Sequence, residues 1–424
     1  MERIAIIDGI RTPFCKMGTL FNDVSAQDLG CIATRELLQR TEIDARIIDE
    51  VIFGNVAQPP DAANIARVIA LKSGIPYPVP AYTVHRNCAS GIESVVSGAL
   101  KIQQTEARCI LAGGTESMSN IPFFLTKEMQ EILFQLGRAK SLPAKLQVLS
   151  SLRLKYLTPK IGLALGLTDP VCGLNMGQTA EVLAKEFGIS RKEQDQFSLL
   201  SHQNAVRARD ILREEIVPVI PGPKYKKVVT DDNGPRENQT MEALAKLRPF
   251  FDRASGTVTP GNSSQVTDGA VALLIMSESR ARELGLQPLG FLRAFAFAGV
   301  EPHRMGIGPA HAIPQVLRKA GMNLNDIQSV EINEAFATQV LACLHLLEST
   351  EFAREFGYEG YTGYIKREIL NVNGGAIALG HPVGATGARL ILTMLKHLIR
   401  NNMSVGLVSL CVGGGQGAAV VLER

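Results

Sequence analysis

The chain has 424 residues, of which 46% are hydrophobic and 20% are charged. This is the composition of an ordinary globular protein, and it excludes global disorder. Forty-four basic residues against forty-one acidic ones give a net charge of only +3, so no strong uniform field attracts nucleic acid or an anionic membrane. The length predicts roughly two to four packed units.

The cysteine pattern and the start of the chain indicate the compartment. The seven cysteines are scattered without the paired spacing of a zinc site, so we expect no metal site and a reducing environment. The first residues lead directly into an apolar run at Ile4–Ile7 without the features of a secretory signal. No uninterrupted apolar stretch is long enough to cross a bilayer. We expect a soluble, cytoplasmic protein.

Short β-branched runs alternate with segments of helical length along the whole chain. This alternation predicts an α/β fold. Glycines concentrate just after the strand runs, where tight turns and helix starts need a backbone without Cβ. The clearest strand runs are Ile4–Ile7, Val51–Phe53, Cys109–Ala112, Ala270–Met276 and Val405–Leu410.

The two halves of the chain resemble each other weakly. In the first half, a strand pattern ends at Asn55, and Cys88 later precedes a helix pattern. In the second half, a strand pattern ends at Asn333, His381 precedes a helix pattern, and a further strand ends at Cys411. We therefore predict two pseudo-duplicated α/β halves, each placing a reactive residue where a helix begins.

A long segment between the halves has no counterpart in the second half. We predict an N-terminal half of residues 1–119 and 257–286, an inserted loop or cap domain of residues 120–256, and a C-terminal half of residues 287–424. Inside the insert, basic side chains outnumber acidic ones, which is typical of a helix that lies on a membrane or on a partner. Packing of its leucines on the protein's own body is the competing interpretation. These leucines recur at helical spacing as Leu142, Leu146, Leu149 and Leu152.

Cys88 is the first candidate for chemistry. It follows a proline-rich approach and stands just before the helix pattern of residues 92–102. The positive end of a helix dipole lowers the pKa of a nearby thiol, which favours the nucleophilic thiolate. A buried structural cysteine is the alternative.

His381 lies in a glycine-rich segment and is followed by Pro382, a residue that suits the first turn of a helix. The glycines allow a ligand to approach the backbone closely. A histidine in this place can act as a base toward a nearby thiol. The other histidines lack such a setting.

Cys411 ends an apolar strand and precedes a glycine run whose N–H groups, including that of Gly413, can form an oxyanion hole. A dinucleotide-binding loop is excluded here, because a strand pattern and not a helix follows the glycines. Asn333 also ends a strand, and it can either hold a polarising water or simply cap a helix.

Together these motifs resemble the thiolase superfamily over nearly the whole chain. The resemblance implies the thiolase fold, in which two halves with mixed five-stranded sheets form α-β-α-β-α layers and carry an inserted loop domain. The motifs that carry it include Asp8–Phe14, Asn87–Gly91, Ala112–Ser119, Met176–Gly177, Gly256–Ser264, Asn333–Ala337, Gly380–Gly387 and Cys411–Gly417.

The resemblance also implies a role for each candidate. Cys88 corresponds to the nucleophile that carries the acyl group, and His381 to the base that activates it and helps to bind the enolate oxygen. Cys411 corresponds to the proton shuttle, and Asn333 holds a water at the first oxyanion site. The N–H groups of Cys88 and Gly413 form the second oxyanion site. The implied coenzyme A contacts are Arg236, Ser264, Phe251, Met176, Ala335 and Phe336.

Two departures from the family pattern affect the pantetheine contacts, namely Asn175 in place of a histidine and Pro260 in place of an alanine. The segment of residues 121–175 is longer than in typical biosynthetic members. Within it, residues 138–141 and 152–159 resemble the β-subunits of fatty-acid β-oxidation complexes. This resemblance implies a degradative 3-ketoacyl-CoA thiolase, with coenzyme A as a substrate and no cofactor.

The resemblance further implies a homodimer or a dimer of dimers and a hydratase–dehydrogenase α-subunit as a possible partner. The basic, leucine-rich character of residues 121–160 predicts peripheral membrane contact. Three alternatives stay open at this point. A biosynthetic acetoacetyl-CoA thiolase shares every catalytic group, and a decarboxylating ketoacyl synthase has a similar fold but lacks a second reactive cysteine. A thiolase-like lipid carrier or scaffold would need no chemistry at all.

Overall fold

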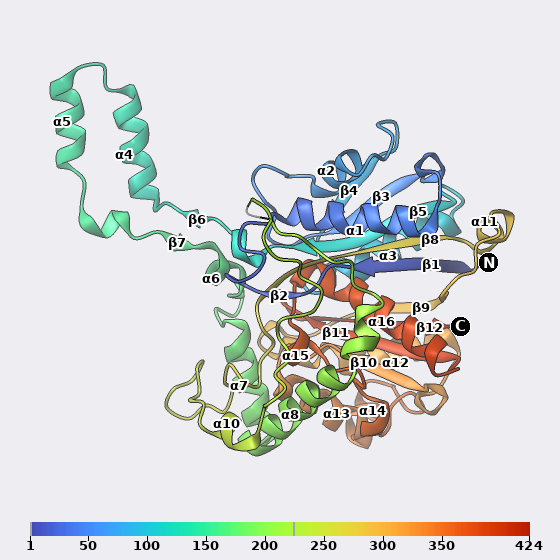
Figure 1. Ribbon diagram of the computed structural model, residues 1–424. Coiled ribbons are helices and arrows are strands. Elements are labelled where there is room, and N and C mark those ends of the chain that lie inside the picture. Colours follow the sequence, from blue (N-terminus) through green and yellow to red (C-terminus); the bar gives the residue numbers. More distant parts are fainter. Residues whose placement is uncertain (1, 224) are drawn as a thin grey trace. The chain divides into compact units, whose positions relative to one another are not determined.

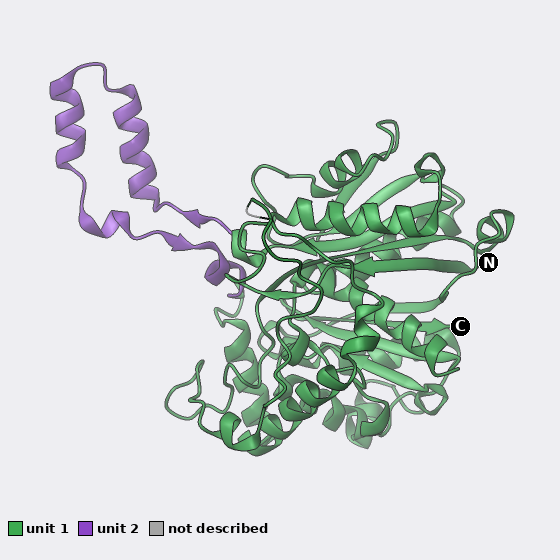
Figure 2. Ribbon diagram, viewed as in Figure 1, with its two compact units in different colours: residues 1–120, 169–424 green, residues 121–168 purple. Residues whose placement is uncertain are grey.

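The structure is a computed structural model that describes residues 2–223 and 225–424. It separates into two compact units (Figure 2). Unit 1 consists of residues 1–120 and 169–424, and unit 2 of residues 121–168.

A continuous mixed sheet runs through unit 1 (Figure 1). Its strands are β1 (Ile4–Arg11), β2 (Cys15–Lys16), β3 (Glu50–Gly54), β4 (Ala81–Val84), β5 (Cys109–Glu116), β8 (Thr267–Ser277), β9 (Gly290–Gly299), β10 (Ser329–Ile332), β11 (Val405–Val412) and β12 (Gln416–Glu423). The order is β10-β11-β12-β9-β1-β8-β5-β3-β4, with β2 paired to β8. The antiparallel pair β1 and β9 joins the two halves.

The two halves of the sheet have the same strand order, β1-β8-β5-β3-β4 in the first and β9-β12-β11-β10 in the second. The second half has four strands, because the place of β4 is taken by a single parallel bridge between Val330 and Leu370. The next residue, Asn371, explains why this strand is so short. Its side-chain amide forms hydrogen bonds of 2.9 Å to both the N–H and the carbonyl of Ile332, so a side chain replaces the backbone ladder.

Helices cover both faces of the sheet. In unit 1 they are α1 (Ala26–Thr41), α2 (Ile65–Lys72), α3 (Ser90–Gln103), α7 (Met176–Glu186), α8 (Arg191–Arg207), α9 (Arg209–Arg213), α10 (Met241–Ala245), α11 (Glu278–Glu283), α12 (Gly308–Ala320), α13 (Ala337–Glu348), α14 (Thr350–Glu355), α15 (Ala376–Leu379) and α16 (Val383–Arg400). Helices α1 and α2 pack on the first half of the sheet, and α12 and α13 pack on the second half. Helices α3 and α16 share one core with the inner faces of both halves. The five alternating layers expected for the fold are thereby confirmed.

Glycines allow α3 and α16 to cross closely near their N-termini. A Cβ on Gly91 would lie 2.6 Å from the backbone N of Ala388, and a Cβ on Gly387 would lie 2.5 Å from that of Ile92. Both helices therefore begin close to their crossing point. Cys88 lies three residues before Gly91, so the crossing determines where the catalytic candidates of both halves lie.

The compact units divide the chain differently from the expected insert of residues 120–256. Only residues 121–168 form a separate unit, whereas residues 169–256 belong to unit 1. The physical reason is that α7 and α8 from this segment pack against α13 of the C-terminal half. Leu183 and Phe197 belong to the same hydrophobic core as that helix.

Unit 2 contains the antiparallel strands β6 (Phe123–Phe124) and β7 (Lys160–Ile161), and the helices α4 (Lys127–Arg138), α5 (Leu142–Ser150) and α6 (Gly162–Gly166). Helices α4 and α5 contact each other. Ile132 is the buried residue of α4, and no residue of α5 is buried. Among the residues that the structure describes, no helix is long and apolar enough to cross a membrane.

Candidate active site

Cys88 lies in the tight connection between β4 and α3 and is half-buried. The preceding residue, Asn87, has a positive φ of 42°. Burial raises the pKa of the Cys88 thiol, while hydrogen bonds from the backbone N–H groups of Gly413 and of Cys88 itself oppose that rise. The shift is therefore opposite to the lowered pKa expected from the helix start, because loss of solvation outweighs these N–H donors. The nucleophile rests as a thiol and needs a base.

Cys411 is the second-last residue of β11, and Gly413 directly follows this strand. Both residues lie beside Cys88. Burial raises the pKa of the Cys411 thiol well above its usual value, and the nearby Cys88 raises it further. The Nδ2 atom of Asn87 donates a hydrogen bond of 2.7 Å to the carbonyl of Gly413. The site therefore holds two neighbouring neutral thiols and a glycine N–H directed at the first of them.

His381 stands two residues before α16 and is 8% exposed. Its backbone N–H donates to the carbonyl of Gln265, and its Nδ1 lies 2.6 Å from the hydroxyl oxygen of Thr386. The same hydroxyl lies 3.0 Å from the carbonyl of Pro382. The tautomer with its proton on Nδ1 satisfies both contacts, because the hydroxyl then accepts from the ring and donates to that carbonyl.

The other ring nitrogen of His381, Nε2, is buried and has no hydrogen-bond partner among the described residues. Burial, together with the charge of Arg389, lowers the pKa of His381 to about 4. The imidazole is therefore neutral at physiological pH, and a lone pair on Nε2 is free to accept a proton. This is the protonation state that a general base requires.

Asn333 follows β10 directly and is 1% exposed. Its backbone N–H is bound to the carbonyl of Ser409. Both the Nδ2 and the Oδ1 atoms of its side chain lack partners among the described residues. A buried amide with no partner is costly, so it fits a water or substrate atom better than a helix cap.

Five of the six residues expected to contact coenzyme A lie in or next to one cluster around Cys411. Cys411, Ala335 and Phe336 form one hydrophobic cluster, against which Met176 and Phe251 pack. The rings of Phe251 and Phe336 meet edge to face at 6.1 Å. A Cβ on Gly413 would lie 3.3 Å from Sδ of Met176. The backbone N–H of Ser264 donates to the carbonyl of Ala335.

Arg236 occupies a different position from this cluster. Its side chain is exposed, and its backbone N–H donates to Nδ1 of His202 at 3.2 Å. The carbonyl of nearby Gly234 accepts a hydrogen bond from the side chain of Gln265, the residue that holds the backbone of His381. Arg236 thus lies on a loop that is tied to the catalytic segment and keeps its guanidinium at the surface.

The structure gives Asn175 a clear local role. Its side chain accepts the N–H of Gln178 at 2.9 Å, and the side chain of Gln178 accepts the N–H of Asn175 at the same distance. This reciprocal pair is a capping box at the start of α7. The departure from the family's histidine therefore keeps the helix that presents Met176 well capped.

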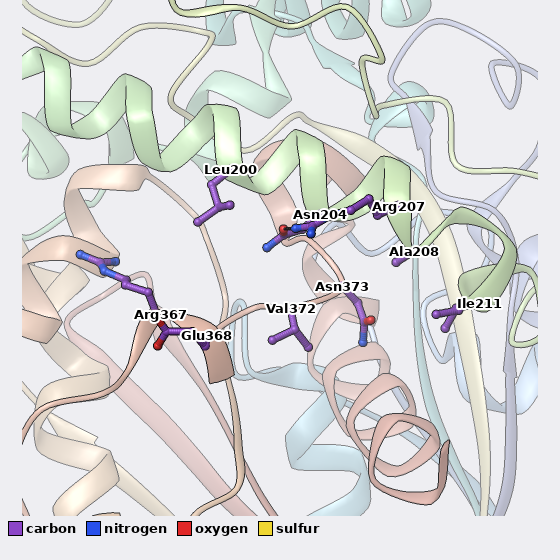
Figure 3. Close-up of a pocket in the computed structure, with 9 residues that line it drawn as sticks. All are labelled: Leu200, Asn204, Arg207, Ala208, Ile211, Arg367, Glu368, Val372 and Asn373. Atoms are coloured by element: carbon purple, nitrogen blue, oxygen red, sulfur yellow. Dashed lines mark hydrogen bonds between the residues drawn. The ribbon is translucent and has the colours of Figure 1, made fainter. Parts of the chain in front are cut away.

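A surface cavity of about 540 Å³ lies apart from these residues, between α8 and the segment that follows Arg367 (Figure 3). None of the residues that line it was expected to take part in chemistry or in binding coenzyme A. They are Leu200, Asn204, Arg207, Ala208, Ile211, Arg367, Glu368, Val372 and Asn373.

The thiolase N-terminal domain model matches residues 4–279, and the thiolase C-terminal domain model matches residues 286–424. The chain belongs to the thiolase family. A 3-ketoacyl-CoA thiolase of Pectobacterium carotovorum subsp. carotovorum is 43% identical to this thiolase, with 100% of this chain and 97% of the relative aligned. The expected family membership, and with it the expectation of an acyltransferase, is confirmed.

Solved structures agree with this assignment. Human mitochondrial 3-ketoacyl-CoA thiolase in complex with CoA matches this thiolase with a TM-score of 0.85 and 36% identity, covering 100% of this chain and 98% of the human one. The acetyl-CoA acetyltransferase of Bacillus anthracis matches with a TM-score of 0.86 and 36% identity, covering 100% and 99%. The fold is thus shared by relatives with both names.

Proposed function

We propose that this thiolase cleaves 3-ketoacyl-CoA with coenzyme A, giving acetyl-CoA and an acyl-CoA shortened by two carbons, in fatty-acid degradation. The names of the full-length relatives support the degradative direction. The observation that carries the catalytic assignment is the neutral, buried imidazole of His381 with a free Nε2, two residues before the helix α16, which crosses the helix after Cys88.

In the first half-reaction, Nε2 of His381 takes the proton of the Cys88 thiol as Sγ bonds to the 3-keto carbon of the substrate. The N–H groups of Cys88 and Gly413 stabilise the oxyanion that forms. The bond between C2 and C3 then breaks, and the shortened acyl group remains on Cys88 as a thioester. Cys411 gives its proton to the α-carbon of the leaving acetyl-CoA.

In the second half-reaction, the thiol of a second coenzyme A attacks the thioester on Cys88. The Cys411 thiolate takes the proton of the incoming thiol, and the departing Sγ regains a proton from His381. Over the two half-reactions, His381 and Cys411 therefore each return to their starting protonation state. In the first half-reaction, a water held by the free amide of Asn333 and the now protonated Nε2 of His381 stabilise the enolate oxygen of acetyl-CoA until Cys411 protonates the α-carbon.

Steady-state thiolysis of short, medium and long 3-ketoacyl-CoA substrates tests this proposal. A degradative enzyme has a higher kcat/KM for medium or long chains than for acetoacetyl-CoA. The alternative of a biosynthetic acetoacetyl-CoA thiolase predicts the reverse order. Absence of any thiolysis would favour a non-catalytic carrier and would overturn the proposal.

We also propose that unit 2 binds an anionic membrane surface. Helix α5 exposes Leu142, Leu146 and Leu149 at 71%, 58% and 47%. Residues 121–168 contain seven basic side chains and two acidic ones. Exposed apolar side chains next to excess positive charge suit the interface of an anionic bilayer. Binding to a hydratase–dehydrogenase subunit, with no affinity for vesicles, is the outcome that would replace this proposal.

A further inference from the structure

Glu116, at the end of β5, is a fully buried carboxylate with no role in the proposed chemistry. Its Oε2 accepts the backbone N–H of Gly384 at 2.9 Å and that of Val56 at 3.1 Å. Its Oε1 accepts the N–H of Ala57 and the side-chain amide of Asn55, both at 3.0 Å. Each oxygen therefore accepts from two N–H donors. A proton bound to either oxygen would point at one of these donors, so the hydrogen bonds favour the ionised carboxylate.

The register of the two halves gives this carboxylate an unexpected counterpart. In the first half, Gly54 of β3 pairs with Gly114 of β5, and Glu116 lies two residues further along. In the second half, Ile332 of β10 pairs with Ser409 of β11, so the residue two positions further along is Cys411. Glu116 thus occupies the position in the first half that Cys411 occupies in the second.

The same register relates the two asparagines. Asn55 follows Gly54 of β3 as Asn333 follows Ile332 of β10. The amide of Asn333 has no partner among the described residues, whereas Nδ2 of Asn55 donates to Glu116 and, at 2.8 Å, to the carbonyl of Thr115. In the second half both amide atoms of Asn333 are free for chemistry, whereas in the first half only Oδ1 of Asn55 lacks a partner among the described residues and Glu116 is bound to backbone N–H groups.

The backbone that Glu116 holds belongs to the catalytic segment. Gly384 lies three residues after His381, in the first turn of α16. At the other end of this short segment, the N–H of His381 is held by the carbonyl of Gln265. A Cβ on Gly114 would lie 2.0 Å from the carbonyl oxygen of Gly384, so β5 and α16 approach as closely as glycine permits.

We propose that Glu116 is a positioning residue that fixes the start of α16 and, through it, the imidazole of His381. This inference rests on the proposed role of His381 as the base toward Cys88. It predicts that removing the carboxylate of Glu116 slows acyl transfer to Cys88 only in a protein that still has His381.

A double-mutant cycle tests this dependence. We compare the rate of acyl transfer to Cys88 from an acyl-CoA donor, followed by mass spectrometry, in wild type, Glu116→Gln, His381→Ala and the double variant. Burial raises the pKa of Glu116 to about 7 despite its N–H donors, so the assays run at about pH 8.5, where the carboxylate is ionised. A glutamine keeps the shape but turns an NH2 group toward two N–H donors.

We expect Glu116→Gln to slow acylation about 10-fold or more in the wild-type background and less than about twofold in the His381→Ala background. Asp169→Asn is the matched control, since it neutralises another buried carboxylate that accepts two backbone N–H groups, those of Val171 and Cys172. We expect this control to keep the wild-type acylation rate to within about threefold.

Three results would overturn the proposal. An equal loss from Glu116→Gln in both backgrounds would show a general structural role for Glu116, while leaving the base assignment intact. A wild-type rate in Glu116→Gln would show no positioning role. A wild-type rate in His381→Ala would overturn the base assignment itself. If Glu116→Gln does not fold, Glu116→Asp keeps the charge, draws the carboxylate back by one methylene, and enters the same cycle.

Discussion

The side-chain amide of Asn87 donates a hydrogen bond of 2.7 Å to the carbonyl of Gly413. This bond joins the loop before the nucleophile in one half to the glycine run after Cys411 in the other. The N–H groups proposed to stabilise the oxyanion belong to Cys88 and Gly413. Cys88 directly follows Asn87 in the chain, and Gly413 is the residue whose carbonyl accepts the bond from Asn87. The bond therefore fixes the spacing between two donors that come from different halves of the fold.

Asn87→Gly removes this bond without straining the backbone, because glycine readily adopts the positive φ of 42° found here. We expect kcat to fall roughly 10-fold with little change in KM, since an oxyanion donor is misaligned in the transition state. Asn87→Ala is the comparison, and it should show a similar fall in kcat with about 1 kcal/mol of additional loss in unfolding free energy. Equal kcat in Asn87→Gly and wild type would contradict this role.

Cys411→Ala should separate the two halves of the chemistry. The variant lacks the thiol that protonates the acetyl α-carbon, so cleavage and formation of the carbon–carbon bond should stop. Acylation of Cys88 from a simple acyl-CoA donor does not need that proton and should remain measurable. Parallel loss of acylation and of cleavage would argue against the proton-shuttle role.

The lowered pKa of His381 has a consequence for stability in acid. The folded protein binds a proton on this imidazole only near pH 4, whereas the unfolded chain binds it near pH 6.5. Falling pH therefore favours the unfolded state of wild type between these two values. We expect His381→Gln to gain about 3 kcal/mol of unfolding free energy relative to wild type between pH 7 and pH 4.

Chemical denaturation of both proteins across this pH range gives the difference directly. Above about pH 7 the difference should be flat, because the histidine is neutral in both states. A difference that is constant over the whole range would mean that His381 titrates normally in the folded protein.

Replacing Leu142, Leu146 and Leu149 by serine tests the role of unit 2. None of these side chains is buried, so we expect the variant to remain folded and to thiolyse short substrates at the wild-type rate. Sedimentation with anionic vesicles should weaken, whereas neutral vesicles should bind neither protein. Loss of soluble protein would show that these leucines stabilise the fold instead.

Much of the fold follows from sequence patterns, because long periodic elements reveal themselves locally. The helix pattern of residues 92–102 lies inside α3. The strand runs that begin at Ile4, Ala270 and Val405 lie inside β1, β8 and β11. The strands are longer than the apolar runs, since pairing continues through polar and glycine residues such as Asp8 and Gly113. Strand β9 is not among the clearest strand runs, because its apolar residues 294–298 alternate alanine with phenylalanine and contain no β-branched residue.

The reactive residues could be found from motifs, but the residues that hold them could not. Thr386 fixes the tautomer of His381 through a contact five residues away on the same segment, and nothing in the sequence distinguishes it from an ordinary helix threonine. Glu116 acts across 268 positions of the chain. The weak duplication was the one available signal, because it placed Asn55 opposite Asn333. Burial raises the pKa of Cys88, and burial cannot be predicted from a helix start alone.

The most direct test of the account is mass spectrometry of the protein after brief incubation with a 3-ketoacyl-CoA in the absence of free coenzyme A. We expect the shortened acyl group as a covalent adduct on Cys88, and we expect added coenzyme A to release it as acyl-CoA. Cys88→Ser should form no adduct, because a serine hydroxyl is far less acidic than a thiol. An adduct on Cys411, or turnover by Cys88→Ser at the wild-type rate, would contradict the assignment of Cys88 as the nucleophile.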